Sequence, residues 1–179
     1  MSRLATVVID MLNPYDHDDS DELARQTESR IEPLRGLIDA TRESECDLVY
    51  VNDNYEDFTA TSKDLGENAM NGRHPELVEP ILPPEGSLFV QKVRHSAFYS
   101  TSLDHLLRVR EIDTLVLAGQ VTEQCILYSA LDAYVRGFSV RIPRDAVVPI
   151  IPELGDAALR MMESNMRAHV IPAAEALGA

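Results

Sequence analysis

The chain has 179 residues, of which 45% are hydrophobic, and its formal net charge at pH 7 is −14. A chain of this length and apolar content buries a substantial core without disulfides or a structural metal. So strong a negative charge repels phosphate backbones and anionic lipid headgroups, which argues against nucleic acid or a membrane surface as a partner.

A single domain over residues 1–179 is expected, because no linker, repeat or low-complexity tract interrupts the sequence. No apolar run approaches the roughly 20 residues that span a bilayer, and the first residues lack the features of a secretory signal peptide. Two cysteines, Cys46 and Cys125, are too few for a disulfide framework. These observations favour the cytoplasm, where the charge either keeps the protein soluble or steers a cationic ligand.

Six short runs rich in apolar and β-branched residues predict strands at residues 5–11, 48–51, 88–91, 114–118, 139–142 and 168–171. Most of these runs are apolar throughout, which is typical of strands covered on both faces in a parallel sheet. Helical periodicity lies between them, at residues 31–38, 103–107, 126–135 and 153–166.

The alternation of strands and helices predicts right-handed crossovers and a three-layer α/β/α sandwich. We expect a six-stranded, mostly parallel, doubly wound sheet of the Rossmann-like type, with strand order 3-2-1-4-5-6. Segments 13–28 and 55–84 show little periodicity. Connections of that length usually form a binding site or a lid, or are mobile.

Three chemically active residues follow predicted strands. Asp10 follows the first strand, Lys92 the third, and Cys125 lies in a segment that leads from the fourth strand into a helix. Ligands of doubly wound sheets bind outside the carboxyl ends of the strands. The order of residues therefore predicts that a carboxylate, an ammonium and a thiol meet at one edge of the sheet.

Cys125 has the sequence context of a nucleophile. Thr122 suits a helix N-cap, which would place Cys125 in the first helical turn, where free N–H groups favour an anion. We expect this position and the Lys92 ammonium to lower the thiol pKa, and the same free N–H groups to hold an oxyanion. Alternatives stay open from the residues alone: Cys125 as a small buried apolar residue, Asp10 as a loop cap, and Lys92 as a snorkelling side chain.

The segments 8–13, 91–98 and 119–126, together with 143–146, carry a family resemblance. In order and spacing they resemble the isochorismatase-like cysteine hydrolases over nearly the whole chain. The resemblance implies that Asp10 is the general base for Cys125 and that Lys92 holds the ionised pair. The thiolate then attacks a carbonyl carbon, an amine leaves, and water cleaves the thioester.

The resemblance also implies a cis peptide between Gln120 and Val121. This bond aims the N–H groups of Val121 and Cys125 at the oxyanion, and the Thr122 hydroxyl is placed to help hold it. Family nicotinamidases bind a divalent metal through an Asp-x-His pattern after the second strand. Here Asn52 and Asn54 stand at that place, so we expect neither a metal nor any other cofactor.

Pocket residues are expected from their positions after the strands. The candidates for substrate binding are Asn13, Tyr15, Asn52, Tyr55, Phe98, Tyr99 and Gln124. Aromatic walls with a few amide groups suit a small, flat or carbamoyl-bearing molecule. We assign no chemical role to His95, His105 or Cys46.

The leading hypothesis is a metal-independent cysteine hydrolase that cleaves a C–N bond of a small amide, ureide or carbamoyl compound. One alternative is vinyl-ether hydrolysis of an isochorismate-like acid, and another is a non-catalytic binding or redox-sensing member of the family. The resemblance further implies a homodimer or homotetramer, to which the predicted helix at 126–135 contributes.

Overall fold

The computed structural model describes residues 3–178, so the ends of the expected domain, residues 1 and 179, lie outside the described part. The strands are β1 (Leu4–Ile9), β2 (Asp47–Asp53), β3 (Leu88–Lys92), β4 (Thr114–Gln120), β5 (Ser139–Pro143), β6 (Val147–Val148) and β7 (His169–Ile171). The helices are α1 (Ser20–Glu28), α2 (Ile31–Glu43), α3 (Ser62–Met70), α4 (Pro75–Val78), α5 (Leu103–Val109), α6 (Leu127–Val135) and α7 (Pro152–Met166). Shorter turns are the 3-10 helices η1 (Glu79–Ile81) and η3 (Ala173–Glu175) and the π-helical turn η2 (Thr122–Ile126).

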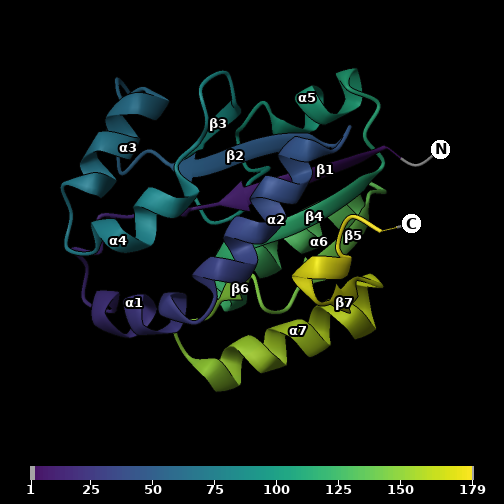
Figure 1. Cartoon of the computed structure of the whole chain (residues 1–179). Coiled ribbons are helices and arrows are strands. Elements are labelled where there is room, and N and C mark those ends of the chain that lie inside the picture. Colours follow the sequence, from purple (N-terminus) through teal and green to yellow (C-terminus); the bar gives the residue numbers. More distant parts are fainter. Residues whose placement is uncertain (1–2, 179) are drawn as a thin grey trace.

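One parallel sheet runs through the described residues in the order β3-β2-β1-β4-β5-β7 (Figure 1). The expected order of six strands is confirmed along this path, with residues 169–171 as its last strand. The short strand β6 was not expected and pairs with β4 beyond the end of β5. All the strand pairs are parallel, so the carboxyl ends of β1 to β4 meet at one edge.

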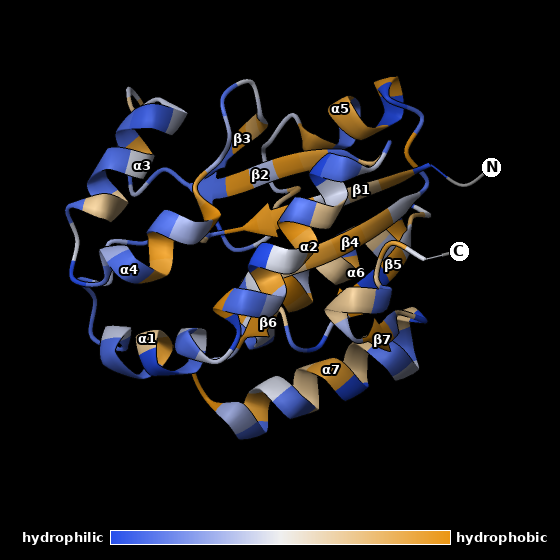
Figure 2. Ribbon diagram, viewed as in Figure 1, coloured by the Kyte–Doolittle hydropathy of each residue, from blue (hydrophilic) through white to orange (hydrophobic). Residues whose placement is uncertain are grey.

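The central strands are buried on both faces, as their apolar sequences predict. In β1, Ala5, Val7 and Ile9 contribute to one core cluster, whereas Leu4 and Val8 contribute to the other. The two-residue period of a strand therefore divides one apolar run between two cores. In Figure 2 these strands form a hydrophobic band through the middle of the molecule.

Each core is closed by a layer of helices. Residues of α5, α6 and α7 pack in one cluster, and residues of α1, α2, α3 and α4 pack in the other. Figure 1 shows α2 in front of the strands and α6 behind them. The expected three-layer α/β/α sandwich is therefore confirmed. Within residues 3–178, no helix is both long and apolar enough to cross a membrane.

The two segments without clear periodicity contain helices that the sequence pattern did not indicate. Residues 13–28 include α1, and residues 55–84 include α3 and α4. α1 and α3 are short and mostly polar, and α4 has only four residues, so none of them gives a repeating apolar pattern. Leu65 and Ala69 of α3 nevertheless reach the core, which tertiary packing alone decides.

Gly119 allows β4 to approach β1 at the active edge of the sheet. Its φ of +109° is disfavoured for residues with a side chain, and a Cβ built there would lie 2.2 Å from the carbonyl oxygen of Ile9. Because Gly119 directly precedes Gln120 and directly faces the strand that leads into Asp10, this close contact sets the separation of the two catalytic segments.

We expect Gly119→Ala to destabilise the fold by at least about 2 kcal/mol, because backbone rather than a flexible side chain blocks the added methyl group. Urea unfolding of the purified variant measures this loss. Gly36→Ala is the matched control, since Gly36 lies in α2 with no atom near the added Cβ. There the same change should stabilise the protein by about 0.5–1 kcal/mol. Equal effects at both positions would contradict the steric argument.

Candidate active site

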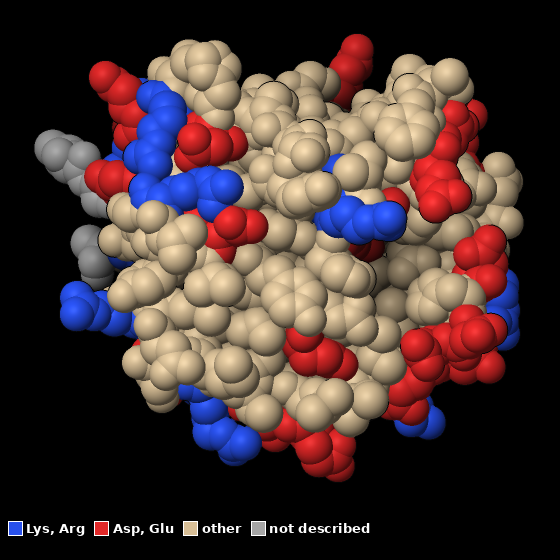
Figure 3. Space-filling model, turned by 180° about the vertical axis from the view of Figure 1, so that it is seen from behind, with Lys and Arg blue, Asp and Glu red and all other residues tan. Residues whose placement is uncertain are grey.

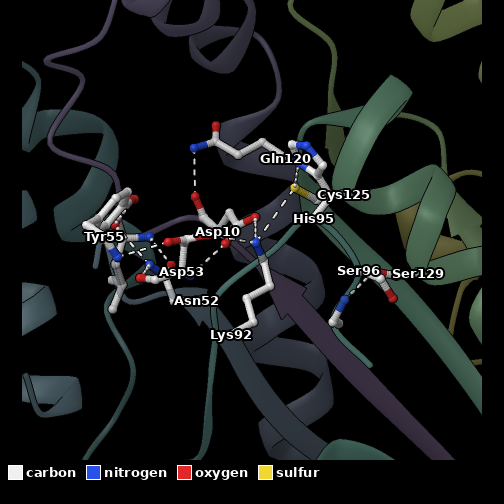
Figure 4. A network of polar contacts seen from close by, with 12 residues as sticks. Asp10, Asn52, Asp53, Tyr55, Lys92, His95, Ser96, Gln120, Cys125 and Ser129 are labelled. Atoms are coloured by element: carbon white, nitrogen blue, oxygen red, sulfur yellow. Dashed lines mark hydrogen bonds and ion pairs between the residues drawn. The ribbon is translucent and has the colours of Figure 1, made fainter. Parts of the chain in front are cut away.

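The structure gathers Asp10, Lys92 and Cys125 at the carboxyl edge of the sheet (Figure 4). The Lys92 Nζ lies 2.9 Å from Asp10 Oδ2 and donates to Cys125 Sγ at 3.8 Å. The Asp10 carboxylate also lies close enough to the Cys125 thiol for each group to shift the pKa of the other. The expected meeting of a carboxylate, an ammonium and a thiol from three distant segments is therefore a feature of the fold.

Asp10 is held by backbone and side-chain contacts from two neighbouring strands. Its own N–H donates to the carbonyl of Val51, and its Oδ1 accepts from the Asp53 N–H at 2.8 Å. The Gln120 side chain donates to its carbonyl oxygen at 2.7 Å. These bonds fix a left-handed backbone with φ of 55°, a conformation that costs a residue with a side chain about 1–2 kcal/mol.

Lys92 is a buried cation whose charge two carboxylates balance. Its side chain is 1% exposed, and its Nζ lies 3.4 Å from Asp53 Oδ2 in addition to the contact with Asp10. The register of β2 and β3 places Asp53 directly beside Lys92. The sequence analysis assigned no role to Asp53, although its place at the end of the second strand is the same kind of signal that indicated Asp10.

The turn that carries Cys125 follows β4 directly. It begins with a cis peptide between Gln120 and Val121, as the family resemblance implied, and continues into the π-helical turn η2. The N-cap assignment to Thr122 is wrong, because helical geometry begins at Thr122 itself and Val121 precedes it in extended form. The Thr122 hydroxyl is buried and has no hydrogen-bond partner among the described residues.

Glu123 fastens this turn to a neighbouring loop. Its Oε1 accepts from the backbone N–H groups of Ile150 at 3.0 Å and Ile151 at 2.9 Å. Those groups precede α7 and would otherwise lack partners, since the start of a helix leaves its N–H groups free. The carboxylate therefore ties the position of Cys125 to the start of α7.

Burial dominates the ionisation of these groups. It raises the pKa of the Asp10 carboxyl above its ordinary value, and the Lys92 ammonium offsets this only in part. Burial and the neighbouring Asp10 carboxylate raise the pKa of the Cys125 thiol to about 12, against the lowering effect of Lys92. Burial lowers the pKa of Lys92, but the attraction of Asp10 and Cys125 outweighs it and leaves that pKa raised.

The expected lowering of the Cys125 pKa is wrong for the resting site. The Lys92 ammonium lowers this pKa, but desolvation and the Asp10 carboxylate act in the opposite direction and outweigh it. A thiol with this pKa is protonated at neutral pH. Attack on a substrate therefore needs a base in contact with the thiol, and Asp10 is in that position.

A cavity of about 390 Å³ opens over these groups. Among the residues expected to bind substrate, Asn13, Tyr55 and Gln124 line it, and so do Gln120 and Val121. The Tyr55 hydroxyl donates to the Leu12 carbonyl at 2.9 Å, which holds its ring at the wall. The cavity is large enough for a small amide, and Cys125 forms part of its lining.

Four residues expected in the pocket lie outside its lining: Tyr15, Asn52, Phe98 and Tyr99. Tyr15 is fully buried beneath α1, with its hydroxyl on Thr27. Phe98 packs in the core against Phe138, and Tyr99 is 56% exposed. The positions of the strand ends therefore predicted which loops surround the cavity. They did not predict which side chains of each loop face it.

Asn52 supports the site instead of lining it. Its Oδ1 accepts from the Leu12 N–H at 2.9 Å, and its Nδ2 donates to the Leu12 carbonyl at 3.2 Å. This pair of bonds clamps the loop that follows Asp10 to the end of β2. A buried amide with both ends satisfied is costly to remove, so the clamp keeps the two carboxylate-bearing segments together.

His95 is the principal cavity residue that the sequence analysis left without a role. Its Nδ1 lies 3.9 Å from Cys125 Sγ, and its ring contacts that of Tyr128 at a centroid distance of 5.6 Å. His17 and Asp19, from the segment before α1, also line the cavity. The sequence indicated only that His95 lies three residues after Lys92, near the expected site. The conformation of the loop decides that its side chain faces the cavity.

The end of β2 does not provide the donors of a divalent metal. The Asn52 amide is occupied by Leu12, and Asn54 Oδ1 accepts from the Glu56 N–H at 3.1 Å. Among residues 3–178, no group of three or more His, Cys, Asp or Glu is arranged to hold a metal ion. The residues present do not fit a metal there, and no chemical step is derived through one.

Removal of the Asp10 charge should make Cys125 ionise at lower pH, because that carboxylate raises the thiol pKa. We expect Asp10→Asn to increase the rate of Cys125 alkylation near neutral pH by about tenfold for each unit by which the pKa falls. Lys92→Met should slow alkylation, since the ammonium acts in the opposite direction. Iodoacetamide labelling across a pH series, read by peptide mass spectrometry, measures both effects. Cys46 serves as the internal control, and unchanged profiles would contradict this electrostatic account.

The family model described as "Isochorismatase domain" matches residues 5–175 of the chain. The isochorismatase family protein YaaI from Bacillus subtilis (strain 168) is 31% identical to this chain over 166 residues. That alignment covers 93% of this chain and 92% of the relative. The similarity therefore extends over all the segments that form the site.

Two solved structures have the same fold over nearly their full length. The N-carbamoylsarcosine amidase from Thermoplasma acidophilum is 32% identical, with a TM-score of 0.74, and the match covers 98% of this chain and 99% of that one. The nicotinamidase PncA from Bacillus subtilis is 30% identical, also with a TM-score of 0.74, covering 94% and 99%. The chain belongs to the isochorismatase family and is a hydrolase of that family.

Proposed function

We propose that this hydrolase cleaves a C–N bond of a small amide, ureide or carbamoyl compound without a metal, through a thioester on Cys125. The observation that carries the proposal is the contact of one sulfur atom with both Asp10 and Lys92 at the floor of the cavity. A thiol, a base and a fixed cation in direct contact are the parts that nucleophilic acyl transfer requires.

The first half of the reaction forms the thioester. Asp10 accepts the proton of the Cys125 thiol as the sulfur attacks the carbonyl carbon, and the carbonyl π electrons move to the oxygen. When the tetrahedral intermediate collapses, the C–N bond breaks and Asp10 returns the proton to the leaving nitrogen. Lys92 keeps its proton throughout and offsets the negative charge that passes between Asp10 and the sulfur.

The oxyanion in this proposal accepts hydrogen bonds from the N–H groups of Val121 and Cys125. Val121 lines the cavity beside the sulfur, and Glu123 and Gln120 fix the turn that carries both groups. Donors that are held in place before the reaction need no reorganisation as the charge develops, and one such donor contributes about 3–4 kcal/mol.

The second half releases the acid. Asp10 takes a proton from water, the water oxygen attacks the thioester carbon, and the C–S bond breaks to regenerate the thiol with the proton from Asp10. The raised pKa of Asp10 suits this repeated exchange, because a carboxyl group with a raised pKa is a stronger base than an ordinary one. The activities for which the N-carbamoylsarcosine amidase and the nicotinamidase are named support C–N cleavage as the reaction class.

Cys125→Ala is expected to abolish hydrolysis of small amides and ureides, with a loss of at least about 10³-fold in kcat/KM, since no other thiol and no serine or threonine hydroxyl lines the cavity among residues 3–178. The assay follows release of ammonia or amine from a panel that includes nicotinamide, N-carbamoylsarcosine and isochorismate. Cys46→Ala is the matched control and should keep full activity. Mass spectrometry of the quenched native enzyme should detect an acyl adduct on the Cys125 peptide.

Two outcomes would contradict this proposal. Isochorismate turnover that survives Cys125→Ala would favour vinyl-ether hydrolysis. A native chain that is inactive on the whole panel would favour a binding or redox-sensing role.

We further propose that the enzyme acts in the cytoplasm as a homodimer or homotetramer. Cys46 and Cys125 are both free thiols, which suits a reducing compartment and a cysteine nucleophile. On the outer face of α6, Tyr128, Leu131 and Val135 are exposed apolar residues. Figure 3, which views the side of the molecule on which α6 lies, shows a broad uncharged area. Exposed apolar residues grouped on one face of a helix in this way are typical of a subunit interface.

Leu131→Glu should lower the molar mass measured by light scattering towards that of one chain, because a charge buried at a subunit interface is not compensated. Phe58→Glu is the control, since Phe58 is a more exposed apolar residue in the loop after β2. It should leave the mass unchanged. A native protein that is already monomeric at high concentration would contradict the proposed assembly.

A further inference from the structure

The cavity over Cys125 holds more negative than positive charge. Three carboxylates line it, those of Asp10, Asp19 and Asp53, against the single ammonium of Lys92. With neutral histidines, the lining therefore has a formal excess of two negative charges. An anionic group in this cavity would meet repulsion that falls slowly with distance in a partly desolvated space.

Lys92 is not free to bind an anionic substrate. Its Nζ is 2.9 Å from Asp10 Oδ2 and 3.4 Å from Asp53 Oδ2. The side chain is 1% exposed, and the same nitrogen donates to the Cys125 sulfur. A substrate carboxylate could pair with this ammonium only by displacing the catalytic contacts. The one ammonium in the cavity thus serves the protein's own anions.

The entrance adds to this negative potential. Asp16, Asp18 and Asp19 are all exposed in the segment that leads into α1, of which Asp19 lines the cavity. Figure 3 shows acidic side chains gathered along the edge of the molecule on which α1 lies, beside a hollow in the surface that also has a basic side chain at its rim. Charges of one sign around a cleft attract ligands of the opposite sign and repel those of the same sign.

The guanidinium groups of the described chain do not offset this charge inside the cavity. No arginine belongs to the lining among residues 3–178. Arg94, two residues after Lys92, is exposed on the loop after β3. The remaining polar groups of the wall are the amides of Asn13, Gln120 and Gln124 and the two imidazoles of His17 and His95. These groups donate and accept hydrogen bonds, which suits an uncharged amide or carbamoyl group.

We infer that the substrate carries no carboxylate and is an uncharged or cationic small amide or carbamoyl compound. This inference rests on the proposed function and narrows it. It separates amides such as nicotinamide, which has no anionic group, from carbamoyl acids such as N-carbamoylsarcosine, which has one. An isochorismate-like dianion is the least compatible with the charges of the cavity.

Charged thiol reagents test the inference without a known substrate. In a Cys46→Ala background Cys125 is the only thiol. Its labelling rates are measured with the 2-aminoethyl (cationic) and 2-sulfonatoethyl (anionic) methanethiosulfonates. The ratio of the two rates is compared with the same ratio for 2-mercaptoethanol, so that the intrinsic reactivities of the reagents cancel. The thiolate fraction of Cys125 cancels as well, because both reagents attack the same thiol.

At an ionic strength of about 0.01 M, we expect the cation-to-anion ratio at Cys125 to exceed that of 2-mercaptoethanol by about tenfold or more. The excess should shrink at about 1 M, where the screening length falls to about 3 Å. The assay is run at about pH 8, where histidine is ordinarily neutral. A ratio equal to or below that of 2-mercaptoethanol at low salt would overturn the inference.

Single variants then assign the effect to the cavity. Asp19→Asn should lower the ratio about two- to threefold at low salt, whereas Asp39→Asn, on the outer surface of α2, should leave it unchanged. Arg94→Gln should change the ratio less than Asp19→Asn does. A larger effect of Arg94→Gln would show that this guanidinium enters the cavity, and would overturn the inference.

Turnover provides the second readout. Nicotinamide, its N1-methyl cation and 5-carboxynicotinamide form a series of similar size with neutral, positive and negative charge. Where the enzyme hydrolyses such amides, kcat/KM for the anionic member should be at least about tenfold below the neutral one at low salt. Loss of all amide turnover with an intact reagent ratio would refute the proposed function alone. A kcat/KM that is higher for 5-carboxynicotinamide than for nicotinamide would refute the inference about substrate charge and leave the proposed function standing.

Discussion

The buried ion pair between Lys92 and Asp10 is the interaction on which the rest of the site depends. Their side chains are 1% and 13% exposed, and the two charged atoms lie 2.9 Å apart. Removal of one partner from a buried pair leaves an uncompensated charge and costs about 3–5 kcal/mol. Asp53 adds a second anion to the same ammonium. Loss of one charge of this group therefore leaves an uncompensated charge at the floor of the cavity, beside the sulfur of Cys125.

The parallel sheet makes this ion pair possible, because it brings the ends of β1, β2, β3 and β4 to one edge. Asp10 follows β1, Asp53 and Lys92 face each other at the ends of β2 and β3, and Gly119 and Gln120 end β4. Several short connections then fix the edge. The Asn52 amide clamps the loop after Asp10. The site is thus built from strand ends that the core holds in place, with loop segments at its entrance.

Burial explains two properties of the site together. It keeps Cys125 protonated at rest by raising the thiol pKa, and it strengthens the ion pairs that occupy the Lys92 ammonium. The enzyme therefore depends on a base in contact with the sulfur instead of a permanently ionised thiolate. The same balance leaves the cavity with an excess of carboxylates. Reactivity and the charge preference that we infer for the substrate are consequences of one arrangement of charges.

The sequence by itself determined six strands of the sheet and the three residues at its edge, because apolar runs and strand ends are local features. The expected strand order followed from the doubly wound pattern of alternating strands and helices. It did not determine α1, α3 and α4, whose few apolar residues find partners only across the fold. Nor did it determine the raised thiol pKa, the role of Asp53 or the approach of His95 to the sulfur. Desolvation and side-chain direction depend on all the atoms that surround a group, and those atoms come from distant parts of the chain. Only the tertiary structure decided them.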